Sequence, residues 1–372
     1  MGMIINPYMS ALAAAPTVGT DIASLSGGGD TSADVCILSS TDAILAIHSG
    51  SINGRCVHIG RSAATLTAGT EAGYGTVDSA TRSRLAALSS TKFVVLYNSS
   101  SVLKAKVGTL SGATISYGSS VDVLAYDATN FDVSALDSTH VVAWYNDPND
   151  STANIGKCVV LTESAGSLTV NTPQTFSDGS IGTTGRSMTA CEADSTHGVA
   201  VYTDSSHPVK VRVCAISVSG TTITAGTAVD AYSGSATNKD IASFSSSAFV
   251  SLHRDGTNKR LVGVPLSLSG TTLTAGTEQS IYQSAGTTYP QVFSLAALDA
   301  NTGHAYYDDD SNDGKVVRVS LFSNVLTVVS QVGSITSGTY DTSVAAAYDS
   351  TYAINCYGDN AETDEARSVV TY

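Results

Sequence analysis

Short apolar runs alternate with clusters of Ser, Thr, Gly and Asp along the chain. The stretch from residue 83 to residue 119 is typical, because it contains four such runs: Ser83–Leu88, Lys92–Asn98, Leu103–Leu110 and Ala113–Ser119. Runs this short, rich in Val, Leu, Ile, Thr and Tyr and bounded by turn residues, predict β-strands. No stretch has the pattern of a helix, so the chain is predicted to be all-β.

A phrase of the type Leu-Ser-Ser-Thr recurs seven times. Its copies start at residues 38, 88, 136, 193, 244, 298 and 348, so successive starts lie 50, 48, 57, 51, 54 and 50 residues apart. Nine positions after six of the starts stands an aromatic ring, and these rings belong to Tyr97, Tyr145, Tyr202, His253, Tyr307 and Tyr357. Ile47 fills this place in the first copy. A period of about fifty residues built from four strands is typical of propellers and solenoids.

The two ends of the chain favour a closed ring over an open solenoid. The seventh copy stops after its third run, Ala366–Tyr372. The missing fourth run occurs at the start of the chain, where Thr17–Asp21 (TVGTD) resembles the fourth-strand phrase Thr67–Glu71 (TAGTE). We therefore expect the N-terminal strand to complete the last blade, which leaves no unpaired edge at the seam.

Small residues in the first run of each copy, such as Ala86-Ala87, fit the crowded axis of such a ring. Over residues 17–372 the pattern resembles seven-bladed β-propellers with four-stranded antiparallel blades. Gly112, Gly220 and Gly270 stand between the third and fourth runs, where we expect positive φ in tight hairpins. The recurring Tyr ends an apolar run, so the pattern leaves open whether the ring lies in the core or at the rim.

Composition limits the range of partners. Charged residues make up 13% of the chain, against roughly 25% in globular proteins, and the net charge is -14 with 18 Lys and Arg. An acidic, charge-poor surface argues against nucleic-acid binding and against attachment to anionic membranes. No run is long enough to insert into a membrane, and the N-terminus lacks the cationic region of a secretory signal peptide. The six cysteines are expected to be buried free thiols, although their even number permits disulfides.

One acidic stretch has the first half of a calcium loop. Asp309, Ser311 and Asp313 alternate and Gly314 follows, as in the front of an EF-hand loop. Position twelve is Ser320, where a bidentate Glu is expected. Two interpretations remain open, a solvated acidic hairpin tip and a Ca²⁺ site, and no other cofactor is indicated.

Catalytic signatures are absent from the sequence. His140 and His197 occupy the same place in adjacent copies, which makes them turn residues, and no Ser, His and acid trio has a motif around it. The Asp-box of sialidases, the Trp-Asp ending of WD repeats and the paired glycines of kelch blades do not occur. Paired carboxylates for sugar cleavage stay open, because separation in space cannot be read from sequence. We predict no catalytic residue and no enzymatic activity.

The first residues carry a resemblance to a protein class. Met3–Tyr8 (MIINPY) is similar to the openings of tailed-bacteriophage virion proteins. The resemblance implies a tail, fibre or capsid-surface protein. Such a protein is expected on the surface of the extracellular virion particle. It implies that residues 1–16 form an apolar arm that binds other virion subunits. The arm residues expected to make this contact are Ile4, Ile5, Pro7, Tyr8 and Met9.

On this interpretation the propeller is a structural or adhesive protein whose loops bind a partner subunit or cell-surface glycan. The first alternative is a soluble, lectin-like propeller with one pocket between each pair of blades. Its aromatic contacts would then recur at exposed positions. The second alternative is a polysaccharide hydrolase or lyase, for which no set of residues stands out.

Overall fold

The described part of the chain consists of strands and their connections, with no helix. The computed structural model describes residues 18, 22–23, 31–48, 53–78, 83–150, 154–183, 187–205, 209–234, 236–284, 290–336, 340–359 and 365–372. Within these ranges no helix is present that could span a membrane. The N-terminal arm residues Ile4, Ile5, Pro7, Tyr8 and Met9 lie outside the described residues.

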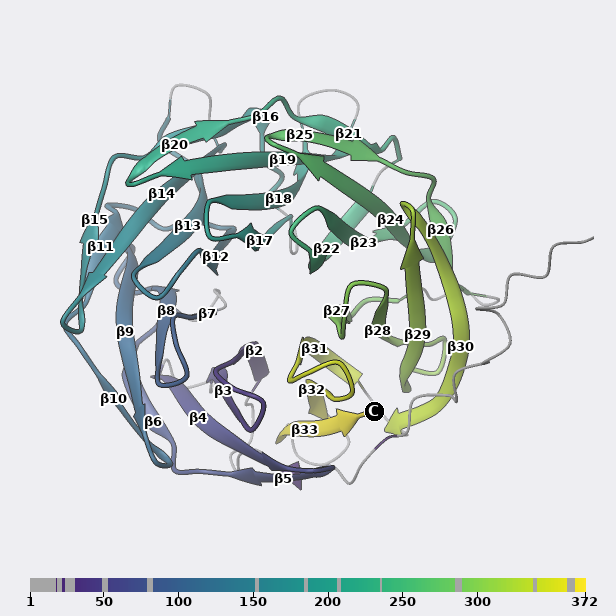
Figure 1. The fold of residues 1–372 in the computed structure, drawn as a ribbon, viewed down its shortest axis with the longest axis horizontal. Coiled ribbons are helices and arrows are strands. Elements are labelled where there is room, and N and C mark those ends of the chain that lie inside the picture. Colours follow the sequence, from purple (N-terminus) through teal and green to yellow (C-terminus); the bar gives the residue numbers. More distant parts are fainter. Residues whose placement is uncertain are drawn as a thin grey trace, which may run out of the picture.

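Seven antiparallel sheets stand around a central opening (Figure 1). In each sheet the chain starts at the axis and moves outward strand by strand, and we number the sheets as blades 1 to 7 in chain order from β2. The predictions of an all-β class and of a closed ring of seven blades are confirmed. Figure 1 shows the first strands lining the opening and the outer strands at the periphery.

The four positions in the blades are occupied as follows. The first strands are β2 (Thr31–Ile37), β7 (Arg84–Ala87), β12 (Phe131–Ala135), β17 (Met188–Asp194), β22 (Ala236–Ser245), β27 (Phe293–Ala297) and β31 (Tyr340–Ala347). The second strands are β3 (Asp42–His48), β8 (Lys92–Asn98), β13 (His140–Asp147), β18 (His197–Asp204), β23 (Ala248–Asp255), β28 (Thr302–Asp308) and β32 (Ala353–Asp359). The third strands are β4 (Asn53–Ser62), β9 (Leu103–Ser111), β14 (Ile155–Ser164), β19 (Lys210–Ser219), β24 (Arg260–Ser269), β29 (Gly314–Phe322) and β33 (Glu365–Thr371). The outer strands are β5 (Thr65–Ala68) with β6 (Ala72–Thr76), β10 (Thr114–Tyr117) with β11 (Val121–Leu124), β15 (Ser167–Val170) with β16 (Gln174–Ser180), β20 (Thr222–Ala225) with β21 (Val229–Tyr232), β25 (Thr272–Ala275) with β26 (Gln279–Gln283), β30 (Val325–Thr336) and β1 (Ile22–Ala23).

The outer strand is interrupted in five blades. In blade 1, both β5 and β6 pair with β4, and between them the Gly69 N–H donates to the His58 carbonyl at 2.8 Å. The same bond recurs from Gly118 to Val107 in blade 2. The two short segments are therefore one fourth strand with a bulge, which preserves the predicted four-stranded plan.

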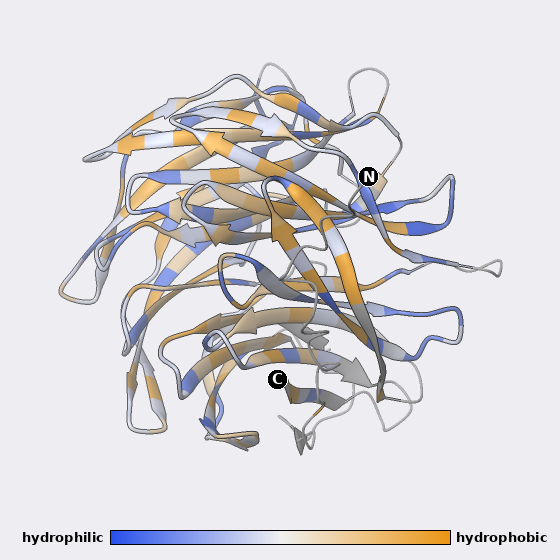
Figure 2. Ribbon diagram, turned by 45° about the vertical axis from the view of Figure 1, so that its right-hand side comes forward, coloured by the Kyte–Doolittle hydropathy of each residue, from blue (hydrophilic) through white to orange (hydrophobic). Residues whose placement is uncertain are grey.

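The core lies between the blades. The second strands are buried on both faces, as in β8, where Phe93 to Tyr97 are at most 3% exposed. Each hydrophobic cluster combines neighbouring blades, for example Val94 of blade 2 with Val133 and Val141 of blade 3. Figure 2 shows hydrophobic residues along the strands and the most hydrophilic ones mainly near strand ends. Burial on both faces explains why these strands read as continuous apolar runs.

The N-terminal strand closes the ring as the sequence predicts. Val18 bridges Thr371, and Ile22 pairs with Ser368 of β33. In blade 1 the corresponding pairs are Ala68 with Ile59 and Ala72 with Cys56. Val18 and Ile22 thus occupy the register positions that Ala68 and Ala72 have in blade 1.

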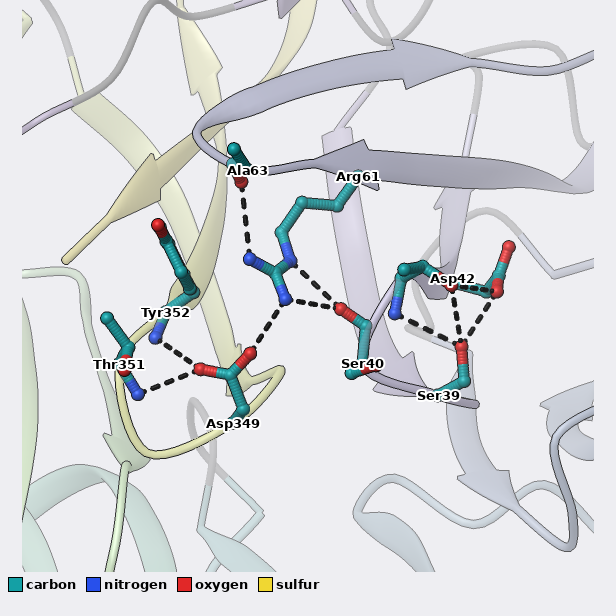
Figure 3. Close-up of polar contacts among 9 residues, drawn as sticks. Ser39, Ser40, Asp42, Arg61, Ala63, Asp349, Thr351 and Tyr352 are labelled. Carbon is teal, nitrogen blue, oxygen red and sulfur yellow. Dashed lines mark hydrogen bonds and ion pairs between the residues drawn. The ribbon is translucent and has the colours of Figure 1, made fainter.

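Arg61 joins blade 1 to blade 7, on the face of the molecule where the turns after the first strands lie (Figure 3). Its guanidinium donates to Asp349 Oδ2 at 2.7 Å and, through Nε, to the Ser40 carbonyl at 3.0 Å. The guanidinium carbon also lies 4.9 Å and 4.2 Å from the ring centres of Tyr348 and Tyr352. Stacking and bidentate donation suit arginine better than lysine, so this contact depends on the guanidinium itself.

The repeated phrase is a side-chain-capped turn. In blade 3, Asp137 Oδ1 accepts the Thr139 N–H at 2.6 Å, and in blade 7, Asp349 Oδ1 accepts the Thr351 N–H at 2.8 Å. Such turns explain the recurrence of Asp and Ser at the second position of the phrase. The predicted hairpin glycines also have positive φ, with 59° at Gly112, 61° at Gly220 and 58° at Gly270.

Candidate functional site

The first strands enclose a channel of about 350 Å³ on the ring axis. Small side chains such as Ala86, Ala296 and Ala346 contribute to its wall, as expected where seven blades converge. Its wall also contains four carboxylates. Asp34, Asp132 and Asp240 lie on blades 1, 3 and 5, and Glu192 lies on blade 4.

Three of these carboxylates connect neighbouring blades. Asp34 of blade 1 accepts the Leu85 N–H of blade 2 at 2.7 Å. Asp132 of blade 3 accepts the Ala190 N–H of blade 4 at 2.9 Å, and Asp240 of blade 5 accepts the Leu295 N–H of blade 6 at 2.8 Å. The inner edge of each blade has no further strand, so carboxylates supply acceptors that a strand would otherwise provide. We call these contacts the carboxylate clasps.

The clasp at Asp132 is the most extensive. Its Oδ2 also accepts the Thr189 hydroxyl at 2.7 Å, and its Oδ1 lies 3.7 Å from Nε of Arg84 in blade 2. Arg84 Nε donates to the Phe131 carbonyl at 3.3 Å. Arg84 and Asp132 are 4% and 5% exposed, so this network joins blades 2, 3 and 4 in a buried setting.

Glu192 is the exposed carboxylate among the described residues of the channel wall. Although water reaches its side chain, the wall encloses it, and this enclosure, reinforced by the Asp132 charge, raises the pKa of Glu192. The neighbouring Cys191 is half-buried, and burial also raises the pKa of its thiol. Among the channel carboxylates, Glu192 is therefore one whose surroundings favour the protonated form more than water does.

The recurring rings belong to the core. Tyr97, Tyr145, Tyr202, His253, Tyr307 and Tyr357 are all 0–3% exposed. Several pack against an aromatic ring on the outer strand of the preceding blade. The ring centres lie 5.1 Å apart for Tyr74 and Tyr97, 5.7 Å for Phe176 and Tyr202, and 4.9 Å for Tyr282 and Tyr307. The recurring ring therefore cannot be the exposed contact that a lectin-like pocket would use.

A charged rim lies beside these rings. Six of the third strands carry a basic residue directly opposite the ring position, and in each pair the two side chains share one face of the sheet: Arg55 opposite Ile47, Lys104 opposite Tyr97, Lys157 opposite Tyr145, Arg212 opposite Tyr202, Lys315 opposite Tyr307 and Arg367 opposite Tyr357. Blade 5 offers Arg260, opposite Asp255. Six of these cations are 19–23% exposed: Arg55, Lys104, Lys157, Arg212, Arg260 and Lys315.

Each of these six cations is paired with at least one carboxylate. Arg212 Nη1 lies 2.7 Å from Asp178, and Lys157 Nζ lies 2.7 Å from Asp150. Arg260 lies 2.7 Å from Glu278. We call these six cations with their acidic partners the charged rim. Partly exposed donors and acceptors side by side can form hydrogen bonds with the hydroxyl groups of a bound ligand.

The junction between blades 4 and 5 departs from this plan. There the ring position is His253, opposite Lys239 of β22, and both side chains are 0% exposed. Burial lowers the pKa of Lys239 to about 7 and, with the Lys239 charge adding to it, the pKa of His253 to about 3. The place of Lys239 is taken by Phe131 in blade 3, Met188 in blade 4, Phe293 in blade 6 and Ser343 in blade 7.

The predicted calcium loop is held by a lysine. Asp309 Oδ1 accepts the backbone N–H groups of Ser311 at 2.8 Å and Asp313 at 3.1 Å. Lys315 Nζ lies 3.2 Å from a carboxylate oxygen of both Asp309 and Asp313. In the described residues no group of three or more His, Cys, Asp or Glu side chains is arranged to hold a metal. Calcium binding stays a prediction here, with an ammonium already between the two carboxylates.

The remaining predicted residues are placed as follows. His140 and His197 lie 2.9 Å and 3.0 Å from the Asp of their own turns, so they are turn residues as predicted. His304 is buried and bonds the Thr371 hydroxyl at 2.9 Å. All six cysteines are free thiols, five of them buried and Cys191 half-buried.

Sequence reasoning missed the carboxylate clasps, the charged rim and Lys239. The rim has a recognisable signal, a basic residue at the start of the third strand, as in Lys104 and Lys315. Loops of different length before the third strand move this residue relative to the repeat start, which hides its recurrence. The clasps leave no comparable pattern, because their partner is a backbone N–H about fifty residues away.

No protein family and no curated protein matches the sequence. Solved structures do match. One is an ulvan lyase of a new polysaccharide lyase family bound to GlcA(1-4)Rha3S (TM-score 0.54, 8% identity, covering 94% of this chain and 95% of that one). Another is a protein of unknown function from Dyadobacter fermentans (0.53, 12%, 96% and 98%). A third is an Aleuria aurantia lectin in complex with a fucosylated GlcNAc (0.50, 13%, 82% and 96%). The chain has the β-propeller fold. At these identities the likeness extends to the fold and no further.

Proposed function

We propose that this protein is a non-enzymatic adhesive propeller that binds neutral glycans at the charged rim. The observation that carries the proposal is the sixfold recurrence of a cation, 19–23% exposed, paired with carboxylates near the junctions between blades. Sugar hydroxyls are both donors and acceptors, so a cation and a carboxylate held together can bind two adjacent hydroxyls.

Stability alone gives a weak reason for this recurrence. A partly exposed ion pair contributes about 0–1 kcal/mol, and single pairs often contribute nothing measurable. The rim nevertheless keeps one cation near the start of the third strand in six blades, although the chain has only 18 basic residues in 372. A binding function repeated around the ring would account for the placement of six of these few basic residues at the rim.

The net charge selects the class of glycan. At -14, the protein repels sulfated or uronate-rich polymers at moderate ionic strength, whereas neutral sugars carry no such penalty. Weak single sites would act together on a surface that displays many glycans, because binding at one site raises the effective concentration at the next. Similar sites spaced around a rigid ring suit adhesion better than capture of one soluble sugar.

Catalysis is not part of the proposal. The carboxylates Asp34, Asp132 and Asp240 of the channel bind backbone N–H groups, which supports a structural role for them. Glu192 is the channel carboxyl whose raised pKa would suit a general acid. If the wild-type protein releases reducing ends or unsaturated products from oligosaccharides and Glu192→Gln does not, the protein is a hydrolase or lyase, and the adhesive proposal is wrong.

A glycan array tests the proposal. The wild-type protein should bind neutral glycans in the presence and absence of EDTA, and the double variant Lys157→Ala/Arg212→Ala should lose at least about tenfold of its signal because avidity falls. The control is Lys92→Ala, which removes a cation from the first-turn face, paired with Glu163 at 2.7 Å. Absence of glycan binding by the wild type, or equal binding by all three proteins, would refute the proposal.

The finer proposal is that the propeller is a virion component of a tailed bacteriophage. It rests on the N-terminal phrase Met3–Tyr8, and residues 1–16 would attach the propeller to other virion subunits. Removing residues 1–16 should leave the propeller and its glycan binding intact while abolishing incorporation into particles. Normal incorporation of the shortened protein would exclude this role and leave the adhesive one standing.

A further inference from the structure

The junction between blades 4 and 5 contains two buried bases at positions where blades 3, 4 and 6 have apolar and phenolic side chains. Lys239 on β22 and His253 on β23 are directly opposite in register, and each is 0% exposed. At the corresponding pair, blade 3 has Phe131 with Tyr145 and blade 6 has Phe293 with Tyr307. Replacing two rings by two proton acceptors is costly in a core, so it calls for a separate explanation.

Lys239 is compensated by neutral oxygens. Its ammonium donates to the Thr203 hydroxyl of blade 4 and to the Ala236 carbonyl at 3.4 Å. Within the described residues it forms no ion pair with a carboxylate, in contrast to Arg260 or Lys210 nearby. A charged Lys239 is therefore buried without a counter-charge.

His253 has less compensation still. Among the described residues, neither ring nitrogen has a hydrogen-bond partner, and the Ser251 hydroxyl beside it on β23 also lacks one. The ring of Tyr232 on β21 lies 4.4 Å from the imidazole. A neutral imidazole tolerates such a site better than an imidazolium, because the charged form loses more hydration on burial.

The charged groups that face His253 do not cancel this effect. Lys239 opposes it from β22 and Arg260 from β24, and both disfavour a second positive charge. Asp255 on β23 is the carboxylate that faces it, and its oxygens are already bound by Arg260 Nε at 2.9 Å and Asn258 Nδ2 at 2.7 Å. The net surroundings of the imidazole therefore remain unfavourable for protonation.

We propose that the junction between blades 4 and 5 is an acid-sensitive opening point of the ring, at which protonation of Lys239 and His253 separates the facing strands locally. In the closed junction each proton adds a positive charge without a counter-charge to the interior. In the open junction water hydrates both charges. Acid therefore favours the open form, and the other junctions, which lack this pair of facing bases in the described residues, do not share the response.

The direction and size of the pH effect on opening follow from the pKa values of the two bases in the closed and open junction. In the closed junction Lys239 has a pKa of about 7 and His253 of about 3, and on opening they return toward their ordinary values of 10.5 and 6.5. Opening thus takes up protons between pH 10.5 and 7 at Lys239 and between pH 6.5 and 3 at His253. Between pH 8.5 and pH 5.5 this linkage favours opening by about 30-fold through Lys239 and about 10-fold through His253, or about 300-fold together.

Hydrogen exchange measured by mass spectrometry tests the proposal. Exchange at pH 8.5 and 5.5 is converted to protection factors with the intrinsic rates, so that the chemical pH dependence cancels. Peptides from β22 and β23 should lose about 300-fold of their protection at the lower pH, whereas β12 and β13 of blade 3 should not. An equal loss in both blades, or no loss in either, would overturn the proposal.

Variants separate the two bases. Lys239→Met should leave the roughly 10-fold response of His253, and His253→Tyr, which installs the residue found in the neighbouring blades, should leave the roughly 30-fold response of Lys239. The double variant should show no blade-specific response. A full wild-type response in either single variant would overturn the assignment, even if the double variant fails to fold. Glycan binding does not enter this measurement, so its outcome is independent of the proposed function.

Discussion

The carboxylate clasp at Asp132 can be tested by Asp132→Ala. This change removes the acceptor for the Ala190 N–H and the Thr189 hydroxyl and leaves Arg84, 4% exposed, without its carboxylate at 3.7 Å. Hydrogen bonds to charged groups contribute about 1.5–3 kcal/mol each, and breaking a buried ion pair costs about 3–5 kcal/mol. These contributions overlap, so we expect a loss of about 4 kcal/mol in the free energy of unfolding.

Urea unfolding provides the measurement, because Trp144, the single tryptophan, is buried directly opposite Asp132. In thermal melts the same loss corresponds to a Tm lower by about 5 °C, given an unfolding entropy of about 2.1 cal/mol/K per residue. The control is Asp122→Ala, whose carboxylate is 64% exposed and pairs with Lys104 at 2.5 Å. That change should cost less than about 1 kcal/mol. If both variants lose the same amount, the clasps do not hold the ring together.

Three further predictions follow from buried or paired charges. Lys239→Met should raise the free energy of unfolding at pH 7 by up to about 4 kcal/mol, because a folded pKa of about 7 destabilises the native state below pH 10.5, and the gain should vanish in melts near that pH. Arg61→Ala should lower it by about 2 kcal/mol through loss of the Tyr352 and Asp349 contacts, and Arg61→Lys should recover less than half, because lysine keeps the charge and loses the stacking. If calcium binds the loop, Lys315→Met should strengthen a calorimetric Ca²⁺ titration; no heat from either protein would exclude a site at Asp309 and Asp313.

The repeat could be recognised in the sequence because the residues that form each turn are neighbours in the chain. Each Ser-Thr turn is capped by a side chain within the same turn, as Asp137 caps Thr139, so the chemistry recurs wherever the turn does. The same holds for the outer-strand phrase, which predicted that the N-terminal strand completes the last blade, where Val18 bridges Thr371. Local turn chemistry and strand length therefore sufficed for blade number, strand order and ring closure.

The contacts between blades could not be predicted in this way. Whether Tyr97 lies in the core or at the rim depends on Tyr74 of the preceding blade, and nothing near Tyr97 in sequence records that partner. A single lysine within a strand, such as Lys239, suggests an exposed position, whereas the structure buries it against Thr203. The sequence therefore predicted the blades but not the contacts between them, which include the carboxylate clasps and the charged rim.

The order of the junctions confines the proposed opening. Carboxylate clasps join blade 3 to blade 4 through Asp132 and blade 5 to blade 6 through Asp240, on either side of the two buried bases. Opening between blades 4 and 5 breaks the contact of Lys239 with Thr203 and leaves both clasps in place. Each flanking pair of blades then moves as a unit, so acid should loosen one sector while the remaining junctions keep the ring folded. Asp132→Ala removes one boundary, and in that variant the acid-induced loss of protection should extend from β22 and β23 into β17 of blade 4.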